Sequence, residues 1–264
     1  MRLCTFEAGG RIAPGRIEGE RVVELDAPSL AAWLGSGGGE VGEHDLGGVR
    51  LLAPVPHPPS VRDFYAFEQH VRTARAARGL EVPPEWYRRP VFYFSNPASV
   101  VGPEEDVAFP PQSDEWDYEL EVATVIGGDG RIAGFTVMND WSARDLQRAE
   151  MSVGLGPAKG KDFATSLGPW LVTADEAGEG PLEMVARVNG EERSRGSSGD
   201  MHWDWEALVA HAEANTRLLP GDVLGSGTVG SGCILEHGDG RWLRSGDVVE
   251  LEIEGLGVLR NRVA

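Results

Sequence analysis

Short runs of alternating apolar and polar residues, separated by glycine and proline, make up most of the chain. Alternation with a period of two is typical of a strand with one buried face. Asn189-Gly190 is the signal of a two-residue hairpin, and an earlier hairpin is expected to turn around Glu18 and Gly19. Together these patterns predict strands within residues 16–25, 117–126, 131–139, much of the chain from 182 onward, and 248–253.

Helical spacing of apolar residues predicts only a few short helices. Ser29 is a candidate N-cap for a helix that runs to Leu34. Ser60 to Asp63 has the spacing of a capping box, with Asp in the position usual for Glu, and predicts a helix from there to Arg78. On that helix Asp63 and His70, seven residues apart, would share one face. Further short helices are expected at 143–149 and 205–214. The fold class predicted is therefore mainly β with a few short helices (α+β).

Two segments rich in glycine or proline divide the chain. The tract Gly35–Gly39 and the run Pro54–Pro59 sustain neither a helix nor a sheet. We therefore expect a small β-rich N-terminal domain over 1–55 and a larger second domain over 60–264.

Charge excludes several classes of partner. The 264 residues contain 24 Lys and Arg against 42 Asp and Glu, a formal charge of −18. Such a chain repels nucleic acid and anionic membrane surfaces. The N-terminus does not resemble a signal peptide and no apolar run could span a membrane, so we expect a cytoplasmic protein. Cys4 and Cys233 lack metal-ligand spacing and are interpreted as inert buried thiols.

Glu119 and Glu121 are the most informative pair of acidic residues. On a strand they share one face, which continues into Ala123 and Val125 rather than into polar residues. Two buried carboxylates about 6–7 Å apart repel each other unless their pKa values rise or a cation binds. A hard divalent cation fits this oxygen-rich pair, and we expect Mg²⁺ first, with Mn²⁺ or Ca²⁺ possible. An exposed strand edge is the competing interpretation.

A second cluster follows at Asp140, Arg144 and Gln147, whose spacing would align a carboxylate, a guanidinium and an amide on one side of a helix. A surface ion pair at a helix start is the alternative. Lys161 and Thr228 lie in glycine-rich loops, where the backbone can approach a ligand.

These motifs resemble the fumarylacetoacetate hydrolase family in content and order, over roughly residues 60–260. The most specific stretch is Asn139-Asp140-Trp141-Ser142-Ala143-Arg144-Asp145, accompanied by Tyr118-Glu119-Leu120-Glu121, Lys161-Asp162-Phe163, Pro220-Gly221-Asp222 and Ser226-Gly227-Thr228. The resemblance implies a mixed β-sandwich roll with a divalent metal at its mouth, usually in a homodimer.

The resemblance also implies roles for single residues. The implied metal ligands are Asp63, Glu119, Glu121 and Asp140. His70 is the implied general base, and Glu236 the acid that orients it. The implied contacts to substrate are Arg144, Gln147, Lys161, Tyr65, Tyr93 and Thr228. A lid arginine is left open among Arg72, Arg75 and Arg78.

The implied reaction is hydrolysis of a carbon–carbon bond in a small ketonic acid, a β-diketone or an acylpyruvate such as fumarylpyruvate. His70, held by Glu236, would activate a water that attacks the metal-chelated 1,3-dicarbonyl, and Lys161 with Gln147 would stabilise the oxyanion. Aromatic catabolism is the expected context. One alternative is decarboxylation of an oxaloacetate-type keto acid, or enol–keto isomerisation, at the same metal. A second is a metal-dependent protein that binds an acid without cleaving it.

Overall fold

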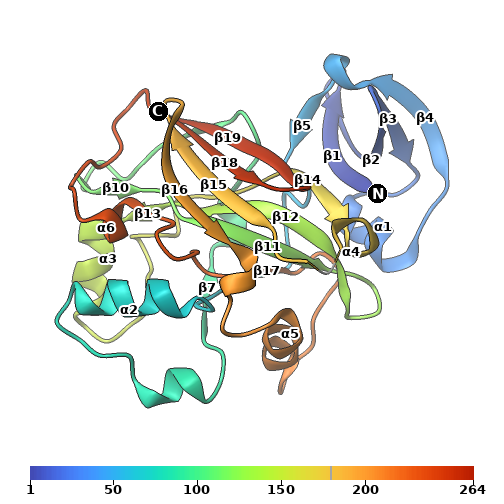
Figure 1. The fold of residues 1–264 in the computed structure, drawn as a ribbon. Helices are drawn as coiled ribbons and strands as arrows, with labels where there is room; N and C mark the ends of the chain where they lie inside the picture. Colours follow the sequence, from blue (N-terminus) through green and yellow to red (C-terminus); the bar gives the residue numbers. More distant parts are fainter. Residues whose placement is uncertain (179) are drawn as a thin grey trace.

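Strands form three sheets in the computed structural model, which describes residues 1–178 and 180–264 (Figure 1). The largest sheet has the strand order β4-β3-β2-β1-β14-β12-β11-β17-β6-β7, with β5 beside β1 and β8 beside β14. The expected mainly β fold with few helices is confirmed. The strands of this sheet are β1 (Arg2–Ala8), β2 (Arg11–Glu18), β3 (Arg21–Leu25), β4 (Glu40–Asp45), β5 (Arg50–Leu52), β6 (Val61–Phe64), β7 (Phe92–Ser95), β8 (Val100–Val101), β11 (Leu120–Ile126), β12 (Ile132–Asp140), β14 (Thr165–Thr173) and β17 (Val223–Gly225).

The N-terminal strands extend this sheet at one end. The predicted hairpin is formed by β2 and β3, and Glu18 pairs with Arg21, so the turn lies at Gly19 and Glu20, one residue later than expected. β1 pairs with β14 and thereby joins the N-terminal strands to the rest of the chain. Helix α1 (Leu30–Ser36) begins after its cap Ser29, as predicted. Nearby, the Glu24 carboxylate accepts hydrogen bonds from Arg11 and lies 3.0 Å from His44 Nε2.

A second sheet packs face to face on the first. Its strand order is β16-β15-β18-β19-β9, and a two-stranded sheet is formed by β10 and β13. Buried apolar residues of both large sheets, including Val122, Val137, Ala186 and Leu251, form one core. The predicted turn at Asn189 joins β15 to β16. The strands of the two smaller sheets are β9 (Asp106–Val107), β10 (Trp116–Asp117), β13 (Ser142–Ala143), β15 (Glu183–Val188), β16 (Glu191–Ser197), β18 (Val248–Ile253) and β19 (Gly257–Val263).

The helix predicted from Ser60 to Arg78 is wrong in its first part. Residues 61–64 form β6, which is fully buried and pairs with β17 on one side and β7 on the other. Pairing with two strands outweighs the local capping signal, and the helix begins only at Glu68. The remaining helices are α2 (Glu68–Ala76), α3 (Arg144–Met151), α4 (Ala174–Ala177), α5 (Trp205–Glu213) and α6 (Ile234–His237).

Two predicted alignments on helices are therefore corrected. Asp63 lies on β6 and not on a helix face with His70. Asp140 ends β12, so it shares no helix with Arg144 and Gln147. These side chains still converge, but through strand register instead of helical spacing.

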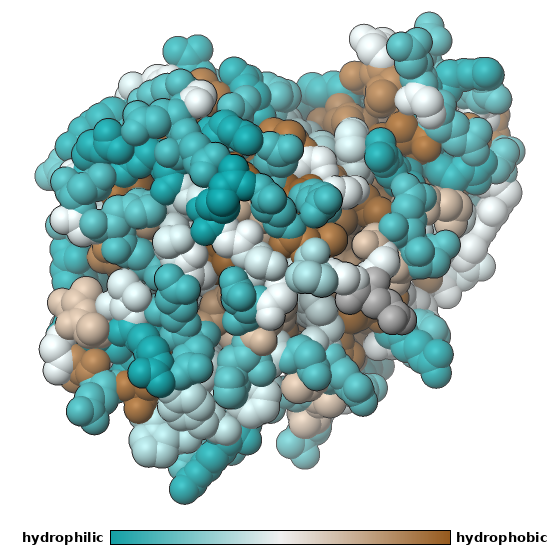
Figure 2. Space-filling model, in the orientation of Figure 1, coloured by the Kyte–Doolittle hydropathy of each residue, from teal (hydrophilic) through white to brown (hydrophobic). Residues whose placement is uncertain are grey.

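Helices α2, α3 and α6 lie at the end of the molecule opposite the N-terminal strands (Figure 1). Among the described residues, none of the helices combines the length and the apolar character needed to cross a bilayer. The face drawn in Figure 2 is mostly hydrophilic.

Candidate active site

Strand register brings four carboxylates to one end of the large sheet. Leu120 at the start of β11 pairs with Asn139 near the end of β12, which places Glu119 beside Asp140. On the other side of β11, β17 ends at Gly225, and Gly225 pairs with Asp63 on β6. Because β17 and β6 are antiparallel to β11, the end of each meets the start of β11.

The four carboxylates form a buried group of oxygen donors. Asp63, Glu119, Glu121 and Asp140 are each at most 4% exposed, and one oxygen from each lies within 4.8 Å of the others. Glu121 Oε2 and Asp140 Oδ1 have no hydrogen-bond partner among the residues that the structure describes. Unpaired buried carboxylate oxygens are costly, and an all-oxygen donor set suits a hard divalent cation. The residues present therefore fit the metal that the motifs predict, while the identity of the ion is not fixed by them.

A glycine makes room for this group. A side chain at Gly225 would place its Cβ 2.6 Å from Asp63 Oδ1 and 2.9 Å from the Met138 thioether. Only glycine at this position lets the Asp63 carboxylate lie against the neighbouring strand.

The electrostatics of the four carboxylates are uneven. Burial raises the pKa of Asp63 and of Glu121 well above their usual values, and repulsion from neighbouring carboxylates adds to it. Burial acts in the same direction on Glu119, but the Lys161 ammonium and the Arg144 guanidinium outweigh it and lower the pKa of Glu119 to about 2. Among the four carboxylates, negative charge is therefore most favourable on Glu119, which lies next to Lys161 and Arg144.

Two buried cations contact the carboxylates. Lys161 Nζ lies 2.5 Å from Asp140 Oδ2 and also contacts Glu119 Oε2. Arg144 Nη2 lies 2.8 Å from Glu119 Oε1, and its Nη1 donates to Gln147 Oε1 at 3.1 Å. The guanidinium is therefore engaged by protein side chains, so it is less free to bind a substrate carboxylate than the sequence suggests.

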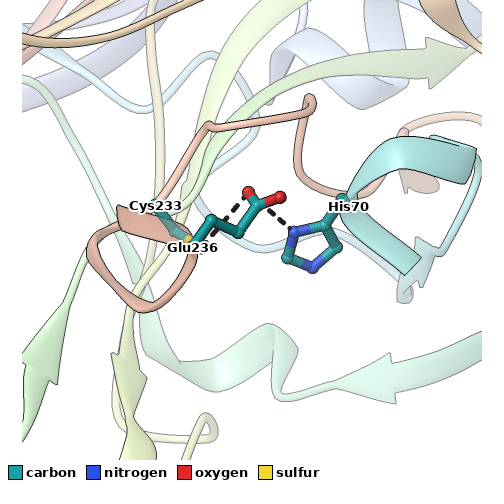
Figure 3. A group of neighbouring side chains, drawn as sticks. All are labelled: His70, Cys233 and Glu236. Carbon is teal, nitrogen blue, oxygen red and sulfur yellow. Dashed lines mark hydrogen bonds and ion pairs between the residues drawn. The ribbon is translucent and has the colours of Figure 1, made fainter. Parts of the chain in front are cut away.

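His70 on α2 faces Glu236 on α6. The distance between His70 Nδ1 and Glu236 Oε2 is 3.0 Å, and both side chains are buried. Figure 3 shows the second ring nitrogen on the side of the imidazole away from Glu236. Tyr65 packs edge-on against the His70 ring. A carboxylate at this distance favours a proton on Nδ1 and leaves the other nitrogen able to accept one.

These residues surround one cavity of about 320 Å³. Asp140 and Glu236 lie next to residues of the cavity wall. Asp140 contacts Lys161 and Tyr93, and Glu236 contacts His70. Thr228 Oγ1 donates to Glu121 Oε1 at 3.4 Å. The structure thus brings all the predicted site residues together, while their roles stay predictions. The predicted residues that line the cavity are Asp63, Tyr65, His70, Tyr93, Glu119, Glu121, Arg144, Gln147, Lys161 and Thr228.

Arg75 and Arg78 line the cavity, whereas Arg72 does not. Arg72 is paired with Glu68 at 2.6 Å. Arg75 donates to the Glu81 carbonyl and Arg78 to the Ala74 carbonyl, so both keep an uncompensated positive charge among the described residues.

Asp117 is a buried residue of the site that the sequence did not single out. Its Oδ2 accepts hydrogen bonds from Arg144 Nε at 2.8 Å and from the Leu235 amide at 3.1 Å. Its Oδ1 accepts from the Ile234 amide at 2.7 Å. One carboxylate thereby fixes both the arginine and the first turn of α6, which carries Glu236.

Family models match nearly the whole chain. The model described as Fumarylacetoacetate (FAA) hydrolase C-terminal matches residues 60–264, and one described as Rv2993c-like, N-terminal, matches residues 1–54.

Relatives of known name carry different activities. A human mitochondrial oxaloacetate tautomerase is 36% identical over 229 residues, which cover 81% of this chain and 69% of that protein. The 2,4-didehydro-3-deoxy-L-rhamnonate hydrolase of a Sphingomonas species is 30% identical, with 100% and 96% covered. The crystal structure of 5-carboxymethyl-2-hydroxymuconate delta-isomerase from Mycobacterium smegmatis has a TM-score of 0.80 at 29% identity, with 100% of this chain and 99% of that chain covered. Two of these three names describe isomerisations and one a hydrolysis.

Proposed function

The chain belongs to the fumarylacetoacetate hydrolase family, and on that premise we propose that it is a metal-dependent isomerase that interconverts the enol and keto forms of an oxaloacetate-type acid. The observation that carries the proposal is that His70 lines the same cavity as Glu119 and Glu121. Such an isomerisation needs only a group that moves a proton and a centre that stabilises negative charge on oxygen. The names of the human and mycobacterial relatives support isomerisation more than hydrolysis.

The metal would be held by Asp63, Glu119, Glu121 and Asp140, whose oxygens lie within 4.8 Å of one another. We propose Mg²⁺ first, with Mn²⁺ or Ca²⁺ as alternatives. When bound, such an ion supplies Lewis-acid stabilisation of an enolate oxygen.

His70 would carry the proton. Glu236 next to Nδ1 holds the ring in the tautomer whose other nitrogen is a base, and it stabilises the imidazolium that forms after proton uptake. Packing of Tyr65 against the ring fixes its orientation. Proton transfer by a positioned histidine contributes about 10²- to 10⁴-fold in rate.

The remaining residues would bind the acid. Lys161 and Gln147 line the cavity beside the carboxylates and are proposed to donate to substrate oxygens, with Tyr93 and Thr228 completing the wall. Arg75 and Arg78 add positive charge to the cavity wall, and this charge would attract a substrate carboxylate into an acidic protein.

Hydrolysis of a carbon–carbon bond is the second candidate. The specific observation in its favour is the His70–Glu236 pair, because a histidine held by a carboxylate can also activate water. The Sphingomonas relative, named a hydrolase, matches along the whole chain. Decarboxylation needs no activated water, so the pair gives it no support.

Other features of the protein are proposed from the family resemblance and the sequence. They are a homodimer, a cytoplasmic location, a role in aromatic catabolism, and a division into domains at 1–55 and 60–264.

The test is a substrate panel with the full chain and Mg²⁺. The loss of enol absorbance is followed for oxaloacetate enol, and cleavage products are followed for fumarylpyruvate and other acylpyruvates. We expect metal-dependent ketonisation of the enol, and its loss in Glu121→Gln. Cleavage of an acylpyruvate without ketonisation would favour the second candidate, and binding of both acids without turnover would refute both.

A further inference from the structure

A second group of metal-ligating side chains lies behind His70. Cys233, at the start of α6, places its thiol 3.5 Å from Glu236 Oε2, the same oxygen that lies 3.0 Å from His70 Nδ1 (Figure 3). The ligand atoms of the three residues all lie within 4.8 Å of one another. None of the three residues belongs to the carboxylate group described above.

Burial and missing partners mark this group as more than a chance contact. The side chains of His70 and Glu236 are 6% and 2% exposed, and Cys233 is fully buried. Glu236 Oε1 has no hydrogen-bond partner among the residues described by the structure. A cation bound by this carboxylate would satisfy that oxygen.

The distances suit zinc. Zinc bonds of about 2.0–2.2 Å to nitrogen or oxygen and about 2.3 Å to sulfur imply tetrahedral edges of about 3.4 Å between N and O and about 3.6 Å between S and O. The observed N–O and S–O separations are 3.0 Å and 3.5 Å, so these two edges would lengthen by only a few tenths of an ångström, and Nδ1 lies within 4.8 Å of the sulfur. Nitrogen and sulfur donors favour a borderline-soft cation such as Zn²⁺ or Co²⁺ over Mg²⁺.

The charges also balance. Burial raises the pKa of the Cys233 thiol, so without metal the sulfur keeps its proton. On zinc binding, the S–H bond breaks, the proton passes to solvent water, and an S–Zn bond forms. The imidazole stays neutral: its proton leaves Nδ1, which would bind the ion, and is carried by Nε2 instead. A thiolate and a carboxylate together then neutralise the +2 ion in a buried site.

We infer that His70, Cys233 and Glu236 form an inhibitory zinc site, separate from the carboxylates that would hold the catalytic metal. Zinc there occupies both members of the proton-transfer pair and stops turnover. The inhibition rests on the proposed function, whereas the binding of zinc does not.

Cobalt binding tests the site without any assay of activity. The full chain is saturated with Mg²⁺ to fill the carboxylate site and is then titrated with Co²⁺. We expect one Co²⁺ per chain and a thiolate charge-transfer band in the near ultraviolet. In Cys233→Ser the band disappears and affinity falls by about tenfold or more, whereas the matched control Cys4→Ser, which changes the other buried cysteine, keeps both.

Folding of each variant is checked by thermal unfolding, and Cys233→Ala provides a second substitution if the serine variant is unstable. No band in the wild-type protein, or an equal band in a folded Cys233 variant, would overturn the inference. Zinc inhibition that Cys233→Ser retains, or that excess Mg²⁺ relieves, would assign the effect to the carboxylates and would likewise overturn it. A cobalt band in a protein without isomerase activity would leave the zinc site standing and refute the proposed function alone.

Discussion

Asp117 offers a sharp test of how the site is held together. The substitution Asp117→Asn keeps the shape of the side chain but removes its charge and one of its two acceptor oxygens. In the wild-type protein the Asp117 carboxylate is fully buried. It accepts hydrogen bonds from two backbone amides of α6 and from Arg144, at 2.7–3.1 Å. We expect loss of function and loss of stability together, because this carboxylate holds both Arg144 and the first turn of α6.

The magnitude follows from the contacts. Breaking a buried ion pair costs about 3–5 kcal/mol, and a buried amide left without its acceptor costs about 1–3 kcal/mol. Arg144 keeps its ion pair with Glu119 at 2.8 Å in the variant, so the cost of the ion pair lost with Asp117 is reduced. We therefore expect the free energy of unfolding to fall by about 3 kcal/mol. Displacement of α6 moves Glu236 away from His70, so kcat falls by about 10- to 100-fold.

Urea unfolding measures the stability, and the pH dependence of kcat for enol ketonisation reports on the His70–Glu236 pair. Asp204→Ala is the matched control, since Asp204 caps α5 through the Ala207 amide and lines no part of the cavity. It should lose about 1 kcal/mol of stability without altering the pH profile. An Asp117→Asn protein with wild-type stability and an unchanged pH profile would refute this reasoning.

Three further predictions concern charge and space. The hydrogen-bonded ion pair with Arg11 is the chief reason why the pKa of Glu24 is lowered to about 2. In the unfolded chain the pKa of a glutamate is about 4.3, so the charge of Glu24 stabilises the fold above that pH. This stabilisation is lost as the pH falls from about 4.3 toward 2. Glu24→Gln should lose about 1 kcal/mol in urea unfolding at pH 7, with a smaller gap to wild type at pH 3 than at pH 7. Arg75→Gln should raise KM for an acidic substrate by about tenfold, whereas Arg72→Gln should not; equal effects would contradict the assignment. Gly225→Ala should weaken Mn²⁺ binding measured by calorimetry by about tenfold or more, because the new Cβ displaces Asp63; unchanged affinity would count against the carboxylate site.

The sequence predicted the turns and helix caps that are determined by interactions between neighbouring residues. The turn after Glu18 and the cap Ser29 are set by neighbouring residues, and both were found within one position. The alternation that placed Glu119 and Glu121 on one face likewise follows from strand geometry. The family resemblance then supplied partners for these residues from distant parts of the chain.

Features that depend on long-range contacts could not be read in the same way. Val61 to Phe64 became a strand because β17, about 160 residues later, pairs with it. Asp117 has its partners at Arg144 and in α6, and no spacing in the sequence links these segments. Cys233 lies three residues before Glu236, but only the fold brings both of them to His70, about 160 residues earlier in the chain.

The most direct test of the proposed site compares metal affinity and turnover in His70→Ala. Calorimetry with Mn²⁺ and enol ketonisation are measured on the same preparation. Because His70 is not among the four carboxylates, we expect nearly unchanged Mn²⁺ affinity and a loss of about 10²- to 10⁴-fold in kcat. Turnover within tenfold of wild type, or a loss that merely follows a loss of bound metal, would contradict the claim that one cavity joins a metal site to a histidine that moves the proton.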